Sequence, residues 1–474
     1  MNRHSYSRRH FLRSSACGFG SVALAALLNE QQVAANSLAV RSPHFKPRVK
    51  HVIFLFMAGG PSQIDLFQYK PRLVKEHGGP IPFARPEGMT ADGMQNSKLL
   101  QPVAGISRHG DSGMWWSELM PHTGALVDDI CLLNGMYTDN PAHAPATLQV
   151  NTGYTQGEHP SMGAWVSYGL GTRNRNLPSF ITINPIMGSI GGPQLYASSY
   201  LPAIHQGTGI HTSKQDPVPT IKYLGRSDLP AAAQREQLAL VEAMNNDLLA
   251  RTKVDSQLEG MIESMELAFR MQTEAPALMD LAGESRATER LYGIDDKATA
   301  TFGQQCLLAR RFVEAGVRFV QLTDVGWDHH SSIRQSLRIN CRGADKPIAG
   351  LIADLKMRGL LDETLIIWTG EFGRTSFDQD TSLGKDSPEM YGRGHNHLGY
   401  SAWLAGGGIK GGLTHGETDE YGFRAVDGKV HLHDLHATML HLLGLDHERL
   451  NYRHKGRDFR LTDVEGHVVR EMLA

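Results

Sequence analysis

The stretch from Asp345 to Gly412 constrains the fold more than any other part of this chain, because a helix, two buried strands and a polar loop follow one another within it. The strands are predicted at 365–368 and 400–404, where apolar residues run on without alternating with polar ones. Such strands are typical of a sheet that helices cover on both faces. The sequence therefore predicts an open, mostly parallel α/β sheet with helices on both faces.

The helix that opens this stretch has apolar residues at spacings of three and four. Asp345 stands at the position of an N-cap, Pro347 falls in the first turn, and Gly359 falls near the end. The pattern therefore predicts a helix that begins at Asp345.

The ends of the two strands carry side chains that are suited to chemistry. Glu371 follows the first strand closely, and a loop with His395 and His397 precedes the second. In open α/β sheets, ligands bind in the crevice beyond the strand ends. We therefore expect the functional site at this edge of the sheet.

An earlier strand is predicted at His51–Met57, and it runs into Gly59, Gly60 and Ser62. Glycines after a strand let backbone amides approach an anion closely, and a helix that starts there favours negative charge. These amides and the Ser62 hydroxyl are candidates for holding anionic oxygens, which makes Ser62 a candidate catalytic residue. The alternative is a tight turn that Ser62 caps.

A further strand, predicted at Val317–Leu322, opens into a loop that holds Asp328, His329 and His330. One carboxylate with two imidazoles suits a borderline divalent cation such as Zn²⁺. The 23 histidines of the chain also favour metal or acid–base chemistry. A pair of surface histidines that binds no metal is the alternative.

His143 stands near the start of a helix that is predicted to end at Gly153. The positive end of the helix dipole would lower the pKa of the imidazole there and attract an anionic substrate. His143 is therefore a candidate general base or nucleophile, and a structural histidine is the alternative.

Near the C-terminus, His433, His436 and His441 have a spacing that resembles a ligand set. A helix with Asp434 as its N-cap and Gly444 at its end explains the same residues. We therefore expect these histidines to be structural.

The chain divides into a leader, a linker and one large domain. Residues 1–35 are predicted to be a twin-arginine export signal, because Ser7–Leu12 matches that motif; an ordinary basic N-terminus is the alternative. Residues 36–50 form a linker, and 51–474 form one α/β domain with a helical insertion at about 228–300, whose methionines are expected to fill a core. We expect a protein in the periplasm or another extracytoplasmic place, without a transmembrane segment after signal removal.

Charge and cysteine content narrow the classes of partner. A net charge of −2 argues against nucleic acid and anionic membranes as partners. The four cysteines have no zinc-type spacing, and Cys17 lies in the leader. The other three, Cys131, Cys306 and Cys341, are expected to be buried free thiols.

Three motifs resemble those of the twin-arginine-exported bacterial family called domain of unknown function 1501. They are Gly-Trp-Asp-x-His at Gly326–His330, Gly-Glu-Phe-Gly-Arg-Thr at Gly370–Thr375 and Gly-Arg-x-His at Gly392–His395. The segment from Asp345 to Gly373 also looks like the helix, strand and loop of sulfatases and alkaline phosphatases. The resemblance implies a fold of that type over roughly residues 50–460, within the superfamily of those enzymes.

The site that this resemblance implies differs from a sulfatase site. Sulfatases place paired aspartates where this chain has Gly59 and Gly60, and their nucleophile position corresponds to His143. The matching positions leave a ligand set for one divalent metal ion, zinc or a similar one, with Asp65 and His397 in reserve. That set is Asp328, His330, Glu371 and His395.

These observations lead to one hypothesis and two alternatives. The hypothesis is an exported metal-dependent hydrolase of phosphate or sulfate esters, with His143 as base or nucleophile and a small anionic ester as substrate. The first alternative is a non-catalytic member of the superfamily that binds an anionic ligand or an extracytoplasmic partner. The second is a structural envelope protein that binds neither metal nor small anions.

Overall fold

The computed structural model describes residues 38–84, 97–186, 188, 191–212, 219–221, 224, 230–252, 256–379 and 388–474. The predicted export signal lies outside these residues. Among the helices of the described ranges, none combines the length and the apolar character that crossing a membrane requires. Cys131, Cys306 and Cys341 are buried and unpaired, which confirms the expectation of free thiols.

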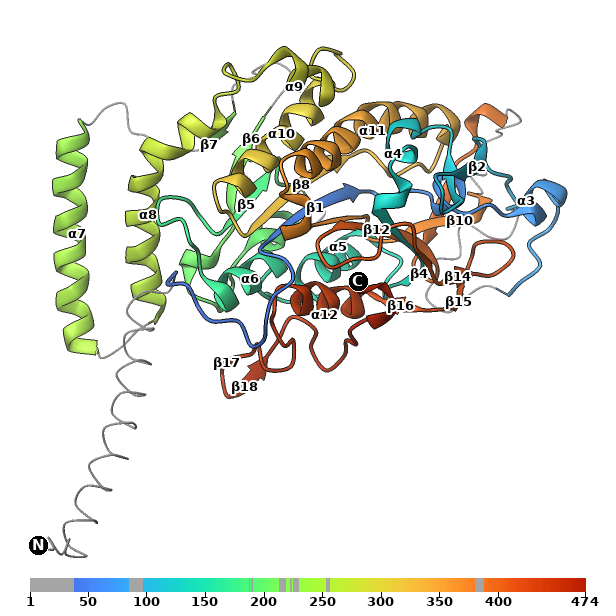
Figure 1. Cartoon of the computed structure of the whole chain (residues 1–474). Helices are drawn as coiled ribbons and strands as arrows, with labels where there is room; N and C mark the ends of the chain where they lie inside the picture. The colour runs from blue at the N-terminus through green and yellow to red at the C-terminus, as the bar shows by residue number, and fades with distance from the viewer. Residues whose placement is uncertain are drawn as a thin grey trace, which may run out of the picture.

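A ten-stranded sheet forms the centre of the molecule (Figure 1). Only β12 and β7 run against their neighbours, which confirms the predicted mostly parallel α/β sheet. A tenth strand, β16 (Val430–His431), also pairs with β4. The order across the sheet is β13 (Thr414–His415), β4 (Ile130–Tyr137), β12 (Tyr400–Gly406), β9 (Thr364–Thr369), β1 (His51–Ala58), β8 (Phe319–Val325), β5 (Phe180–Ile183), β6 (Thr208–His211) and β7 (Thr220–Ile221).

Helices cover both faces of this sheet, as the alternation along β1 shows. Ile53, Leu55 and Met57 belong to one buried cluster, while Phe54 and Phe56 belong to another on the opposite face. The first cluster is covered by α10 (Ala300–Glu314) and α11 (Ile333–Met357), and the second by α5 (His143–Thr152), α6 (Met162–Leu170) and α12 (Leu432–Leu442) (Figure 1).

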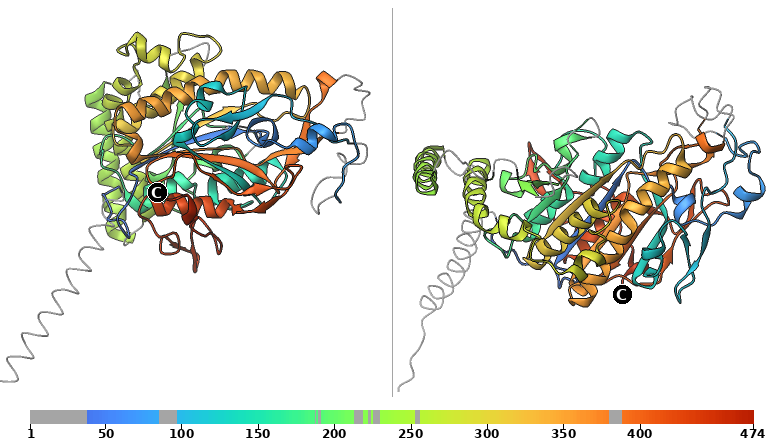
Figure 2. Two further views of the ribbon diagram at one scale, coloured as in Figure 1. Left: turned by 45° about the vertical axis from the view of Figure 1, so that its right-hand side comes forward. Right: turned by 90° about the horizontal axis from the view of Figure 1, so that it is seen from above.

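Two long helices occupy the segment where the sequence predicts a helical insertion. They are α7 (Ala231–Thr252) and α8 (Ser256–Met279), and both views of Figure 2 place α7 at the edge of the molecule beside α8. Met271 of α8 is buried against the core, which agrees with methionine as core filler. Met261 and Met265 are exposed, so for them that expectation is wrong.

The start of α11 differs from the sequence prediction. The helix begins at Ile333, with Ser332 as its N-cap, and Pro347 lies inside it. Asp345 instead binds the first turn of another helix, α4 (Pro121–Gly124), because its carboxylate accepts hydrogen bonds from the backbone N–H groups of His122 and Thr123 at 2.8 Å. Asp345 therefore does cap a helix, because its carboxylate accepts from N–H groups that have no partner within that helix. Sequence spacing does not reveal which helix a carboxylate caps.

The start of α12 also differs by one turn. His431 is the N-cap, and Asp434 is the third helical residue of a capping box, where its side chain accepts from the backbone N–H of His431 at 2.8 Å. The predicted helix is therefore present, but the prediction that Asp434 is its N-cap is wrong.

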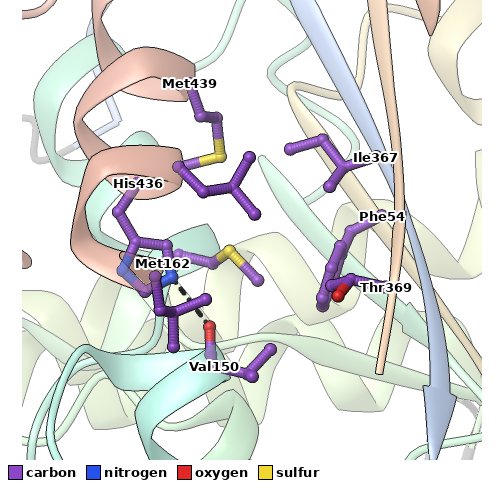
Figure 3. Close-up of a pocket in the computed structure, with 9 residues that line it drawn as sticks. Phe54, Val150, Met162, Ile367, Thr369, His436 and Met439 are labelled. Carbon is purple, nitrogen blue, oxygen red and sulfur yellow. Dashed lines mark hydrogen bonds between the residues drawn. The ribbon is translucent and has the colours of Figure 1, made fainter. Parts of the chain in front are cut away.

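A cavity of about 10 Å³ lies between α12 and the sheet (Figure 3). Its walls are mainly apolar and include Phe54, Met162, Ile367 and Met439. The imidazole of His436 donates from Nε2 to the carbonyl of Val150 at 2.9 Å (Figure 3). The space is about one water in size, and an apolar lining offers such a water too few partners, so we expect it to be dry.

Candidate metal centre

The carboxyl ends of the three central strands bring the candidate site together. Strand β1 pairs with β8 up to Ala58 and Val325 and with β9 up to Phe56 and Thr369, so the loops after these strands emerge side by side. Parallel strands deliver their following loops to one edge of the sheet. The expected convergence at this edge therefore rests on strand register.

Two further segments complete the site from outside these strands. His395 lies on β11 (Arg393–Asn396), which pairs with β10 (Gly373–Asp378) in a separate hairpin. His143 is the first residue of α5, which follows β4. The site thus takes residues from far-separated parts of the chain.

Four side chains form a group that is suited to a metal ion: His143, Asp328, His330 and His395. One donor atom from each lies within 4.8 Å of all the others. The Nε2 atoms of His330, His143 and His395 lie 2.9, 3.2 and 3.4 Å from carboxylate oxygens of Asp328. Three imidazoles therefore point the same ring nitrogen at one carboxylate.

The other ring nitrogen of each histidine has its own partner. Nδ1 of His143 lies 2.6 Å from a carboxylate oxygen of Glu371, and Nδ1 of His395 lies 2.8 Å from the carbonyl oxygen of Pro141. Nδ1 of His330 contacts the side-chain oxygen of Gln379. Histidines that bind metals almost always donate their second N–H to such acceptors, which leaves Nε2 free of a proton for the ion.

The donor set fits a divalent cation. Three neutral imidazoles and one carboxylate are the ligands of a borderline ion such as Zn²⁺. Nε2 of His143 is buried and makes no hydrogen bond of good geometry in the described structure, although it faces Asp328. A bound cation would satisfy this nitrogen.

Glu371 stands behind His143 and outside the group of four. Its carboxylate is fully buried, and both oxygens lie 3.0 Å from the backbone N–H of Gly59. Gly59 has φ +122°, and a Cβ there would lie 2.4 Å from the backbone nitrogen of Asp328. Glycine at this position therefore lets β1 approach Asp328 and lets its amide hold Glu371 rather than a ligand anion.

Arg374 is a functional residue that the sequence reasoning missed. Its side chain is fully buried and donates to Asp328 Oδ1 at 2.6 Å and to the Gly60 carbonyl at 2.8 Å. A guanidinium is a rigid fork of donors, so it fixes the direction in which the Asp328 carboxylate points. The available signal was its place in the Gly370–Thr375 motif.

The charges around Asp328 determine the pKa values of the site. Burial alone would raise the pKa of Asp328, but the three imidazoles that face it and the nearby Arg374 hold it well below its usual range. Burial lowers the pKa of His395 to about 4. For His143, burial also lowers the pKa, yet the adjacent carboxylates of Asp328 and Glu371 outweigh it and raise the pKa to about 9.

This result corrects the expectation for His143. The helix dipole was expected to lower its pKa, but two carboxylates within hydrogen-bond distance act more strongly than the partial charge of a helix end.

The structure does not bring Ser62 into the group of four. Its hydroxyl is fully buried and donates to Asp65, which in turn pairs with the fully buried Arg393 at 2.8 Å. Asp65 is therefore engaged in a buried ion pair. His397, the other reserve ligand, is buried and also lies outside the group.

The sequence belongs to the family described as "Protein of unknown function (DUF1501)", whose model matches residues 49–473. This membership agrees with the resemblance seen in the three motifs. No curated protein matches the chain.

Solved structures with similarity to this chain include sulfatases and phosphatases. The lipoteichoic acid synthase LtaP from Listeria monocytogenes has 11% identity and a TM-score of 0.37, with 91% of this chain and 80% of that chain covered. Phosphonate monoester hydrolase SpPMH from Silicibacter pomeroyi has 13% identity and a TM-score of 0.37, with 90% and 76% covered. An alkaline phosphatase from the Antarctic bacterium TAB5 has 10% identity and a TM-score of 0.32, with 79% and 94% covered. Similarities of this size carry no conclusion about activity.

Proposed function

We propose that this protein is an exported, metal-dependent hydrolase of phosphate or sulfate esters. One observation carries the proposal: three histidines hold Nδ1 against separate acceptors and direct Nε2 at one carboxylate. An arrangement that fixes both the tautomer and the direction of each ring is typical of a metal centre. The family motifs supply two of these histidines and the carboxylate.

In this proposal His143, Asp328, His330 and His395 hold one divalent ion. Such an ion, when bound, polarises an ester oxygen and lowers the pKa of a water molecule toward 7. Glu371 accepts a hydrogen bond from Nδ1–H of His143, and Arg374 orients Asp328. His143 then has both ring nitrogens engaged, so it acts as a ligand in place of the base or nucleophile that the sequence suggested.

The partners and location follow from the same proposal. The cation and the partly exposed edges of His330 and Asp328 would face a small anionic ester. The twin-arginine motif at Ser7–Leu12 supports export to the periplasm or another extracytoplasmic place.

A non-catalytic, ligand-binding protein is the second candidate. The ring of Phe372 favours it, because its centroid lies 5.0 Å from that of His143 and 4.5 Å from that of His395. An aromatic wall against two ligands restricts the room for a nucleophile on that side.

Metal analysis of the purified chain, followed by a substrate screen, tests the proposal. We expect about one divalent ion per chain, and turnover of an aryl phosphate, a phosphodiester or an aryl sulfate that Asp328→Asn and His395→Ala both abolish. Absence of a stoichiometric ion would refute the metal centre. A bound ion without turnover of any of these esters would favour the ligand-binding alternative.

A further inference from the structure

A cleft lies at the other end of α5, away from the candidate metal centre. It has a volume of about 700 Å³, which is within the range of small-molecule sites. His143 begins α5, whereas Tyr154 in the cleft wall follows the C-cap of this helix. A helix of ten residues is about 15 Å long, so the two sites are separate.

The cleft is lined by aromatic rings that hold one another in place. Tyr154 and His159 stack with centroids 3.6 Å apart at an interplanar angle of 8°. Tyr200 stacks on His454 at 5.0 Å and contacts Phe459 at 5.1 Å. All of these except Tyr200 remain partly exposed, so the rings form a rigid wall that is open to a ligand.

The charged groups of the cleft balance one another. The lining holds two acidic side chains, Glu158 and Asp463, and two basic ones, Lys455 and Arg457. Arg457 is also bound to Asp463 at 2.7 Å and covers the ring of Phe459 at 4.8 Å. A site for a cation would show an acidic excess and a site for an anion a basic excess, and this lining shows neither.

The backbone around the cleft is unusually constrained. Among the described residues, five other than glycine have φ in the left-handed region, and Ser199, Lys455 and Asp463 of this cleft are three of them. Lys455 is accounted for by the tight turn between β17 (Tyr452–His454) and β18 (Arg457–Phe459). Ser199 and Asp463 have no such explanation. Strained backbone of this kind is often found at binding sites, so these two residues support a binding role for the cleft.

We propose that this cleft binds a neutral saccharide. Sugar rings have apolar C–H faces that pack on aromatic rings, and their hydroxyls donate and accept hydrogen bonds at once. The exposed side chains of Gln156, Glu158 and Lys455 offer both kinds of partner beside the rings. A balanced set of donors, acceptors and aromatic surface thus matches an uncharged, hydroxyl-rich ligand.

Calorimetric titration of the full chain with maltohexaose, cellohexaose and xylohexaose tests this proposal. At least one of them is expected to bind with a Kd on the order of 1 mM or tighter. His159→Ala removes one ring of the stacked pair and is expected to weaken that binding by about 10-fold or more. Tyr69→Ala is the matched control, since Tyr69 stacks on Trp115 at 4.4 Å elsewhere on the surface.

The remaining outcomes are decisive as well. No binding of the three sugars, binding that His159→Ala leaves unchanged, or binding of only sulfated sugars or tetramethylammonium would overturn the proposal. If His159→Ala lowers the thermal stability, Gln156→Ala provides the same test from an exposed position. The result does not depend on the metal centre, whose ion content is expected to be the same in all of these variants.

Discussion

Two groups of histidines at the two ends of α5 show how the same side chain serves two purposes. At the start of the helix, His143 joins His330 and His395 around Asp328. At its end, His433 and His436 of α12 bind the carbonyl oxygens of Gly153 and Val150 at 2.6 and 2.9 Å. Burial separates the two groups: Asp328 is exposed and its three histidines are half-buried, whereas His433 and His436 are buried.

The chemical difference lies in which ring nitrogen is engaged and in what the other nitrogen faces. In the first group Nδ1 is bound and Nε2 points at a carboxylate, which is the arrangement of a ligand. In the second group Nε2 donates to a backbone carbonyl, and Nδ1 is buried without a hydrogen-bond partner among the described residues. Those rings tie α12 to α5, which agrees with the structural role expected for them.

The largest effect is expected from removing a ligand. His395→Ala should lower metal affinity by more than about 100-fold, because losing a ligand costs more than losing a ligand's hydrogen-bond partner. His433→Ala should leave metal affinity unchanged and lower thermal stability instead. Competition with a chromophoric chelator measures the affinity, and equal losses in both variants would remove the distinction between the two groups.

A smaller loss is expected from the residue that holds His143. Glu371→Gln keeps the shape of the side chain but removes the negative charge that holds the proton of His143 on Nδ1 and leaves Nε2 free for the ion. Metal affinity should therefore fall by roughly 10- to 100-fold. Asp345→Asn is the matched control, because it alters a buried carboxylate that binds α4. Unchanged affinity in Glu371→Gln would show that this carboxylate does not support the ligand.

The two fully buried arginines provide a third comparison. Arg374→Lys keeps a positive charge but loses the fork that orients Asp328, and metal affinity should fall by roughly 10-fold. Arg393→Lys disturbs the pair with Asp65 and should lower the denaturation midpoint without changing metal affinity. Loss of affinity in both variants alike would contradict the separate roles.

The structural histidines predict how stability depends on pH. Burial lowers the pKa of His436 to about 3, against 6.5 for an ordinary histidine. The folded chain therefore binds fewer protons than the unfolded chain between these values, and stability is lost as pH falls from 6.5 toward 3, by up to about 1.4 kcal/mol per pH unit for this residue. Denaturant unfolding at pH 7 and pH 5 measures the slope.

A variant isolates this contribution. His436→Gln retains an N–H for the Val150 carbonyl and removes the titrating group, so its stability should vary less with pH than that of the parent chain. An identical slope in both proteins would show that His436 is not the residue responsible.

The sequence by itself determined the class of fold and most members of the site. Continuous apolar runs such as His51–Met57 are typical of strands buried on both faces, so they indicated the α/β sheet without reference to distant contacts. The family motifs at 326–330 and 392–395 likewise supplied Asp328, His330 and His395 as candidate ligands.

Only the tertiary structure decided what each of these groups does. Strand register decides whether His143 or Glu371 faces the centre of the site. The two residues are 228 positions apart in the sequence, yet their side chains lie 2.6 Å from each other. The same holds for Asp345, which binds a helix that lies elsewhere in the chain, and for Arg374, whose guanidinium donates to Gly60 and Asp328 in two other loops. The local pattern of apolar and polar residues indicates which residues are buried. The hydrogen-bond partner of a buried polar group is instead determined by packing between distant segments.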